Sequence, residues 1–115
     1  MKFRVAEPYQ LPQMNAVLCP DNVDEEAVRK TLLNEFSLEI GAGLGPLKGK
    51  IWRFGLMGYS CRPDNVMLCL SALGSVLSDM GLPVKVGEAE GAAHQAYAAL
   101  HAQDAQHARK KVVAA

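Results

Sequence analysis

The sequence predicts a small α+β domain: a mostly antiparallel sheet with helices packed on one of its faces, followed by an extra C-terminal helix. The first observation is that apolar residues recur at helical spacing in two separate segments, around residues 25–36 and 63–80. The second is that three short strand-like runs accompany these segments, and one glycine-rich loop joins the second run to the third. Both helices have a single apolar face, so both are expected on the same side of the sheet.

The N-terminal third of the chain begins with an extended segment and one strand. Residues 1–13 are expected to be an extended entry segment, because Pro8 and Pro12 interrupt regular structure there. A short, mostly apolar run at 15–19 ends at Pro20 and predicts the first strand. The capping residues of 21–24 then introduce a helix that runs to about residue 36.

The middle of the chain predicts a hairpin and a second helix. Residues 38–40 are expected to form a strand, residues 41–49 a loop with four glycines and one proline, and residues 50–57 another strand. The two strands flanking the loop are expected to pair in antiparallel fashion. Pro63 then suits the first turn of a helix, and Gly81 followed by Pro83 ends it.

The chain is expected to divide into an α+β unit at 1–82 and a C-terminal part at 83–115. Residues 83–87 are expected to be a linker. The alanine-rich segment from 88 to about 111 favours a helix, but its only large apolar residues before the end are Tyr97 and Leu100. This helix is therefore expected to pack weakly or to fray.

Composition excludes several classes of function. Twelve basic and twelve acidic residues cancel, so no basic patch for nucleic acid is predicted. No apolar stretch is long enough to span a bilayer, and no signal peptide is predicted. The three cysteines are odd in number and form no Cys-x-x-Cys motif, which favours a reducing, cytoplasmic location. His94 and His101 lie two turns apart on the terminal helix, so no metal site is predicted.

Arg53 is the leading candidate for a binding residue. It stands between Trp52 and Phe54 in a predicted strand, and a guanidinium among hydrophobic residues is costly unless it is paired. Its planar fork suits a carboxylate. That carboxylate is either Glu39 on the neighbouring predicted strand or a carboxylate of a ligand. Because the two helices occupy one face of the sheet, Arg53 is expected on the opposite face or at its edge.

The glycine-rich loop has two possible interpretations. Its glycines could cradle a phosphate if a helix N-terminus followed, but a strand follows, and the spacing differs from the known phosphate-binding motifs. A hairpin with unusual backbone angles is the simpler interpretation.

Several blocks of the sequence together resemble the C-terminal small domain of the class V aminotransferases, in the alanine–glyoxylate/serine–pyruvate group. The main blocks are Leu-Glu-Ile-Gly-Ala-Gly-Leu-Gly at 38–45 and Gly-Lys-Ile-Trp-Arg-Phe-Gly-Leu-Met-Gly at 49–58, supported by residues 11–17 and 62–66. The resemblance covers about residues 3–81. It implies the same α+β architecture, and it implies that Arg53 holds the α-carboxylate of an amino-acid or keto-acid substrate. Gly41, Gly43 and Gly45 would then form a rim of the substrate pocket.

The resemblance also implies a cofactor that this chain does not hold by itself. Family members use pyridoxal phosphate bound to a lysine of a large domain. None of the seven lysines here lies in a similar motif. We therefore expect no catalytic and no cofactor-binding residue in this chain, and no binding of pyridoxal phosphate to the chain alone.

Two functions remain open at this level. The first is a detached or truncated aminotransferase small domain, inactive by itself, whose partner is a large domain or another copy of the chain. The alternative is a stand-alone α+β binding or dimerisation module without catalysis, in which Arg53 is a carboxylate anchor.

Overall fold

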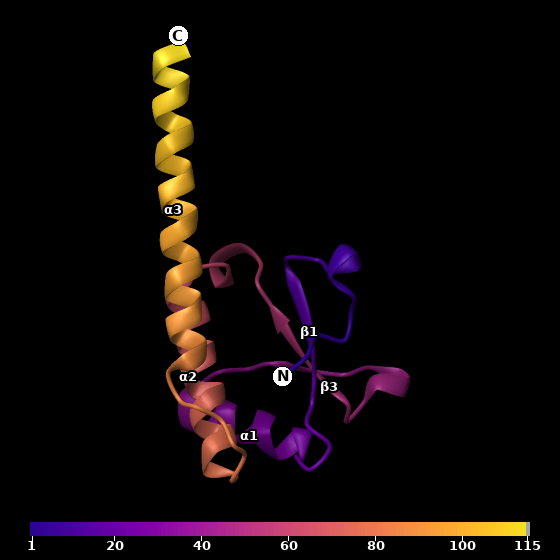
Figure 1. Cartoon of the computed structure of the whole chain (residues 1–115). Helices are drawn as coiled ribbons and strands as arrows, with labels where there is room; N and C mark the ends of the chain where they lie inside the picture. The colour runs from indigo at the N-terminus through magenta and orange to yellow at the C-terminus, as the bar shows by residue number, and fades with distance from the viewer. Residues whose placement is uncertain (115) are drawn as a thin grey trace.

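The computed structural model describes residues 1–114 and confirms the predicted α+β class (Figure 1). A small antiparallel sheet carries helices on one face, and a long third helix continues beyond it. The strands and helices are β1 (Met14–Leu18), α1 (Glu25–Phe36), β2 (Gly41–Ala42), β3 (Ile51–Gly55), α2 (Pro63–Asp79) and α3 (Glu88–Ala114). Short 3₁₀ turns at 7–9, 45–47 and 58–60 connect some of them.

The central strand of the sheet is β3. The strand order is β1-β3-β2, and both pairs are antiparallel. Arg53 lies opposite Ala16 on one side and opposite Gly41 on the other. The segment before β1 adds a bridge between Phe3 and Val17 at the outer edge. The strand that carries the candidate arginine is therefore supported along both of its edges.

The predicted hairpin between the second and third strands is confirmed, but the position predicted for the second strand, at 38–40, is wrong. The structure places β2 at Gly41–Ala42, inside the predicted loop. The cause lies at the end of α1, where Ser37 adopts the left-handed conformation (φ 52°) and its N–H donates to Leu33. The backbone N–H of Leu38 likewise donates to the carbonyl oxygen of Leu32. Residues 37 and 38 therefore still cap the helix, where the strand was expected.

The start of α1 has the capping residue and the acidic first turn that the sequence predicts. The carboxylate of Asp24 accepts hydrogen bonds from the backbone N–H groups of Glu26 (3.0 Å) and Ala27 (3.1 Å). These bonds satisfy donors that have no partner within the helix. Glu25 and Glu26 add negative charge to the first turn, where the helix dipole favours it.

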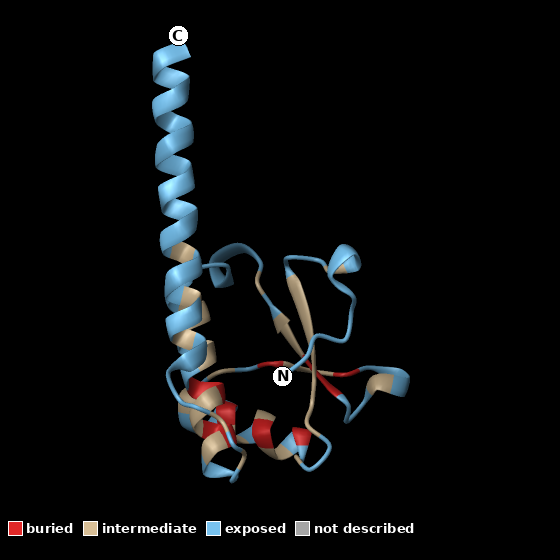
Figure 2. Cartoon of the chain, in the orientation of Figure 1, coloured by how far each residue is buried: buried red, intermediate tan, exposed pale blue. Residues whose placement is uncertain are grey.

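Trp52 occupies the centre of the core between the sheet and the two helices. Its side chain has no exposed surface, and its indole N–H donates to the backbone carbonyl of Glu25 at 3.2 Å. This bond ties β3 to the beginning of α1 across 27 residues of sequence. Figure 2 shows the buried residues gathered along β3, α1 and α2. The cluster around Trp52 consists of Val28, Leu32, Ile40, Ala72, Leu73, Val76 and Leu77.

The third helix differs from the other two in its lack of buried surface. α3 has no buried residue, and its half-exposed residues all lie in its first half, which packs against α2. Every residue from 98 to 114 is exposed, and this part extends away from the rest of the molecule (Figures 1 and 2). Division of the chain at residue 82 remains a prediction, and residue 115 lies outside the described residues.

Candidate carboxylate-binding site

Arg53 lies in the middle of β3 and is half-buried. Side chains alternate between the two faces of a strand. Trp52 and Phe54 face the helices and contribute to or pack against the core. The side chain of Arg53 therefore leaves the sheet on the face opposite the helices, as the sequence predicts.

The guanidinium of Arg53 is bound to the backbone of the neighbouring strand. Its Nε donates to the carbonyl oxygen of Ala42 at 2.6 Å. No ion pair between residues 1–114 includes Arg53, and Glu39, the partner considered from the sequence, has an exposed side chain. Within this same part of the chain, the terminal nitrogens of Arg53 donate no hydrogen bond. The fork of Arg53 is thus oriented by β2 while its outer end remains available.

Gly41 lies directly against this arginine. A Cβ atom at position 41 would be 3.3 Å from the Cβ of Arg53 and 3.4 Å from both Nε and Nη2. The first of these distances is tighter than most contacts of a Cβ atom, and the other two are at the limit of ordinary van der Waals contact. The absence of a side chain at Gly41 therefore lets the guanidinium lie flat beside β2.

The other two glycines expected at a pocket rim have different environments. Gly43 is buried, and a Cβ there would be 2.0 Å from the carbonyl oxygen of Leu47, so the turn can only be made with glycine. Gly45 is exposed with a φ of +53°, a conformation that glycine adopts at low cost. Only Gly41 is brought next to Arg53, and the rim role of all three stays a prediction.

Two other arginines in the chain pair with carboxylates. Arg29 donates from Nε and Nη2 to the carboxylate of Glu25, at 2.8 and 3.3 Å, and this contact raises the pKa of Arg29. Arg62 donates from the same two nitrogens to Asp64, at 3.0 and 3.2 Å, and lowers the pKa of that carboxyl group. Arg62 also lies 5.1 Å from the centroid of the Tyr59 ring. Both pairs are local in sequence, whereas Arg53 pairs with no carboxylate of residues 1–114.

The lysines bear on the expectation that this chain does not hold pyridoxal phosphate by itself. All seven have exposed side chains, whereas a Schiff-base lysine needs an enclosed setting that lowers its pKa. They are Lys2, Lys30, Lys48, Lys50, Lys85, Lys110 and Lys111. These exposed positions support the expectation that the cofactor-binding lysine lies outside this chain, which stays a prediction.

The remaining candidates for chemistry are the metal-ligating side chains and the cysteines. Among residues 1–114, no group of three or more His, Cys, Asp and Glu residues is placed to hold a metal ion. Cys61 is exposed, whereas burial raises the pKa of the Cys19 and Cys69 thiols to about 11. In the part of the chain that the structure describes, no helix is both long and apolar enough to cross a membrane.

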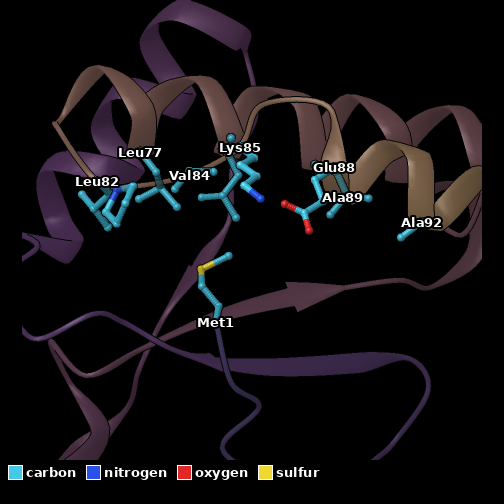
Figure 3. Close-up of a pocket in the computed structure, with 12 residues that line it drawn as sticks. Met1, Leu77, Leu82, Val84, Lys85, Glu88, Ala89 and Ala92 are labelled. Atoms are coloured by element: carbon cyan, nitrogen blue, oxygen red, sulfur yellow. The ribbon is translucent and has the colours of Figure 1, made fainter.

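A crevice of about 430 Å³ lies away from Arg53, between α2, the linker and the start of α3 (Figure 3). Its walls are mainly apolar, and Met1 points into it from the entry segment. Lys85 and Glu88 are its charged lining residues. The crevice lacks a convergent set of buried polar groups, so the candidate site is at Arg53 rather than here.

Sequence signals could not reveal every part of this site. The partner of Arg53 is the backbone carbonyl of Ala42, which has no side-chain signature. Its position depends on where β2 begins, and that depends on the cap of α1. The sequence singled out Arg53 and the glycines as candidates but not the contact that orients the arginine.

Sequence comparison finds relatives among the aminotransferases. The chain is 43% identical over 88 residues to (S)-ureidoglycine–glyoxylate transaminase from Bacillus subtilis, an alignment that covers 76% of this chain and 21% of that protein. Alanine–glyoxylate and serine–glyoxylate aminotransferases are among the other relatives. No protein-family model matches the chain.

Solved structures agree with the sequence relatives. The crystal structure of the B. subtilis ureidoglycine–glyoxylate aminotransferase superposes with a TM-score of 0.73 at 44% identity, covering 75% of this chain and 22% of that one. Pyridoxamine–pyruvate aminotransferase from Mesorhizobium loti gives a TM-score of 0.78 at 30% identity, covering 82% and 24% of the two chains. The chain thus spans about a fifth of the length of the first of these relatives. Its relatives at 30–43% identity are class V aminotransferases, and the chain matches their C-terminal region.

Proposed function

We propose that this chain supplies the arginine that binds the substrate carboxylate in a pyridoxal-phosphate-dependent transamination site. Arg53 is the binding residue, and its ligand is the α-carboxylate of an amino acid or keto acid. A large domain, in the same enzyme or contributed by a partner, would supply the cofactor and the lysine that binds it. The chain alone would then be inactive.

One observation carries the proposal: the guanidinium of Arg53 is fixed at Nε by Ala42, while no carboxylate of residues 1–114 pairs with it. An arginine half-buried on a sheet loses part of its hydration, so an anionic partner is favoured there. Arg29 and Arg62 already have such partners within the fold. The relatives support the ligand class, because their names include glyoxylate and pyruvate, which are both 2-oxo acids with a carboxylate.

The contribution of this chain to catalysis is binding and orientation. Pyridoxal phosphate, when bound in the full enzyme, acts as the electron sink of amino-group transfer. Arg53 would hold the substrate by its carboxylate, on a strand anchored to α1 through Trp52 and Glu25. A rigid strand keeps the reacting end of a small substrate in a constant position, which increases the rate through orientation.

The test is a chimaera in which this chain replaces the matching C-terminal region of the B. subtilis transaminase. The 43% identity over that region favours a compatible domain interface. In the chimaera, Arg53→Lys keeps the charge and removes the bidentate fork. We expect kcat/KM for glyoxylate to fall by about ten- to a hundredfold, corresponding to about 1.5–3 kcal/mol for a charge-assisted pair.

Arg62→Lys is the matched control, because Arg62 is exposed and pairs only with nearby side chains. It should leave kcat/KM within about twofold, as expected for an exposed ion pair. A melting temperature is recorded for each variant. If Arg53→Lys lowers the melting temperature and leaves kcat/KM unchanged, Arg53 has a structural role and the proposal is wrong.

A further inference from the structure

We propose that Arg53 binds its carboxylate end-on, through Nη1 and Nη2, because β2 occupies the other edge of the guanidinium. In this arrangement Gly41 is a positioning residue. The inference rests on the proposed function, since it describes how the same arginine meets its ligand.

A guanidinium offers a carboxylate two different bidentate edges. The side-on edge consists of Nε and Nη2, and the end-on edge consists of Nη1 and Nη2. Both arginine–carboxylate forks among residues 1–114 use the side-on edge: Arg29 with Glu25, and Arg62 with Asp64. Side-on binding is therefore the arrangement that the chain adopts where that edge is free.

At Arg53 the side-on edge is closed by backbone. The single Nε–H donates to the carbonyl oxygen of Ala42 at 2.6 Å. The position that a Cβ on Gly41 would take lies 3.4 Å from Nε and 3.4 Å from Nη2, so this part of the guanidinium lies next to Gly41 of β2. A ligand carboxylate could take Nε only by breaking the bond to Ala42 and moving into space next to β2.

The remaining donors determine where the ligand lies. With Nε occupied, the outward N–H groups of Nη1 and Nη2 can each donate to one carboxylate oxygen. The carboxylate carbon then lies near the extension of the Nε–Cζ direction, beyond the end of the side chain. Because the bond to Ala42 holds Nε beside β2, this geometry selects the direction of the bound acid as well as its charge.

Nitrogen-15 NMR of the guanidinium groups tests the binding edge directly. The 115-residue chain is labelled with ¹⁵N-arginine and titrated with sodium glyoxylate. Arg53→Lys assigns the Arg53 signals, and the exposed Arg4 serves as an internal control for non-specific anion effects. We expect saturable shifts of the Arg53 Nη signals, while the Nε–H signal keeps its position and its slow hydrogen exchange.

Each other outcome overturns the inference in a distinct way. A saturable shift of the Arg53 Nε–H signal, with loss of its exchange protection, shows side-on binding; the carboxylate role then stands and the end-on geometry is wrong. No saturable shift of any Arg53 nitrogen, or shifts matching those of Arg4, removes the carboxylate site itself and with it the proposed function.

A pair of glycine variants tests the positioning role of Gly41. Gly41→Ala adds a methyl group at 3.3–3.4 Å from three atoms of Arg53, and it should speed exchange of the Arg53 Nε–H several-fold and weaken the glyoxylate-dependent Nη shifts. Gly74→Ala is the control, because a Cβ there meets no atom within 4 Å. It should leave the Arg53 spectrum unchanged. Identical Arg53 spectra and titrations in both variants would show that Gly41 does not position the arginine.

Discussion

The surroundings of β3 and the outer half of α3 differ most in how tightly their residues are packed. Residues of β3 are paired on both edges, Trp52 is completely buried, and Gly43 in the adjoining turn has no room for one additional carbon atom. Residues 98–114 of α3 are all exposed. The difference follows from composition, because α2 presents Leu and Val at helical spacing whereas α3 is mostly alanine and polar residues. The candidate site is located in the region where packing defines positions most strictly.

The largest expected effect comes from Gly43→Ala. Its Cβ would be 2.0 Å from the Leu47 carbonyl oxygen and 2.9 Å from a side-chain carbon of Ile51, so the backbone of the turn must move. We expect a loss of about 3 kcal/mol in the free energy of unfolding, the upper end of the usual cost of overpacking. Urea denaturation followed by circular dichroism measures it.

Gly74→Ala is the matched control for this substitution. It lies inside α2 with free space around the new methyl group, and the helix prefers alanine. Its expected effect is a gain of about 0.5–1 kcal/mol. Equal effects of the two substitutions would contradict the account of the turn.

A leucine pair compares the two regions directly. Leu32 in α1 has no exposed surface, so Leu32→Ala leaves a cavity in the core and should cost about 2–5 kcal/mol. Leu100 in α3 is 54% exposed, and Leu100→Ala should cost about 0.5 kcal/mol or less. The same urea titration measures both. A large loss of stability in Leu100→Ala would show that this part of α3 is covered in solution. The contrast in packing between the core and α3 would then not hold.

A smaller effect is expected from alkaline pH. Burial raises the pKa of Cys69 from 9.0 to about 11, so the folded state keeps its thiol proton where the unfolded state has lost it. This contribution to stability is complete below pH 9 and disappears as the pH rises from 9 to about 11. After allowance for partial exposure, its size is on the order of 1 kcal/mol.

The contribution of the Cys69 thiol is found by comparing how steeply stability falls with pH in two proteins. The free energy of unfolding is measured between these two pH values for the unmodified chain and for Cys69→Ala. The unmodified chain should lose more stability than the variant across the interval. Since Cys19 has a similarly raised pKa and remains in both proteins, it contributes equally to each. Parallel curves would mean that the Cys69 thiol does not titrate differently in the two states.

Sequence periodicity predicted the helices well, because the apolar residues of α1 and α2 recur at 3.6-residue spacing and their caps have clear signatures. It misplaced β2, since the left-handed Ser37 carries no strong sequence signal for that conformation. Arg53 could be selected because a charge between Trp52 and Phe54 is unusual. Its bond to Ala42 could not be predicted, because it depends on the register of two backbone segments.

The most direct test of the central claim compares substrates with and without a carboxylate in the chimaeric transaminase. Glyoxylate and glycolaldehyde are both small aldehydes, but glycolaldehyde has a hydroxymethyl group in place of the carboxylate. If Arg53 binds the carboxylate, Arg53→Lys lowers kcat/KM for glyoxylate by about ten- to a hundredfold and changes kcat/KM for glycolaldehyde by less than about twofold. An equal loss of kcat/KM with both substrates would contradict this claim, because it would mean that the substitution disturbs the fold rather than the binding of the carboxylate.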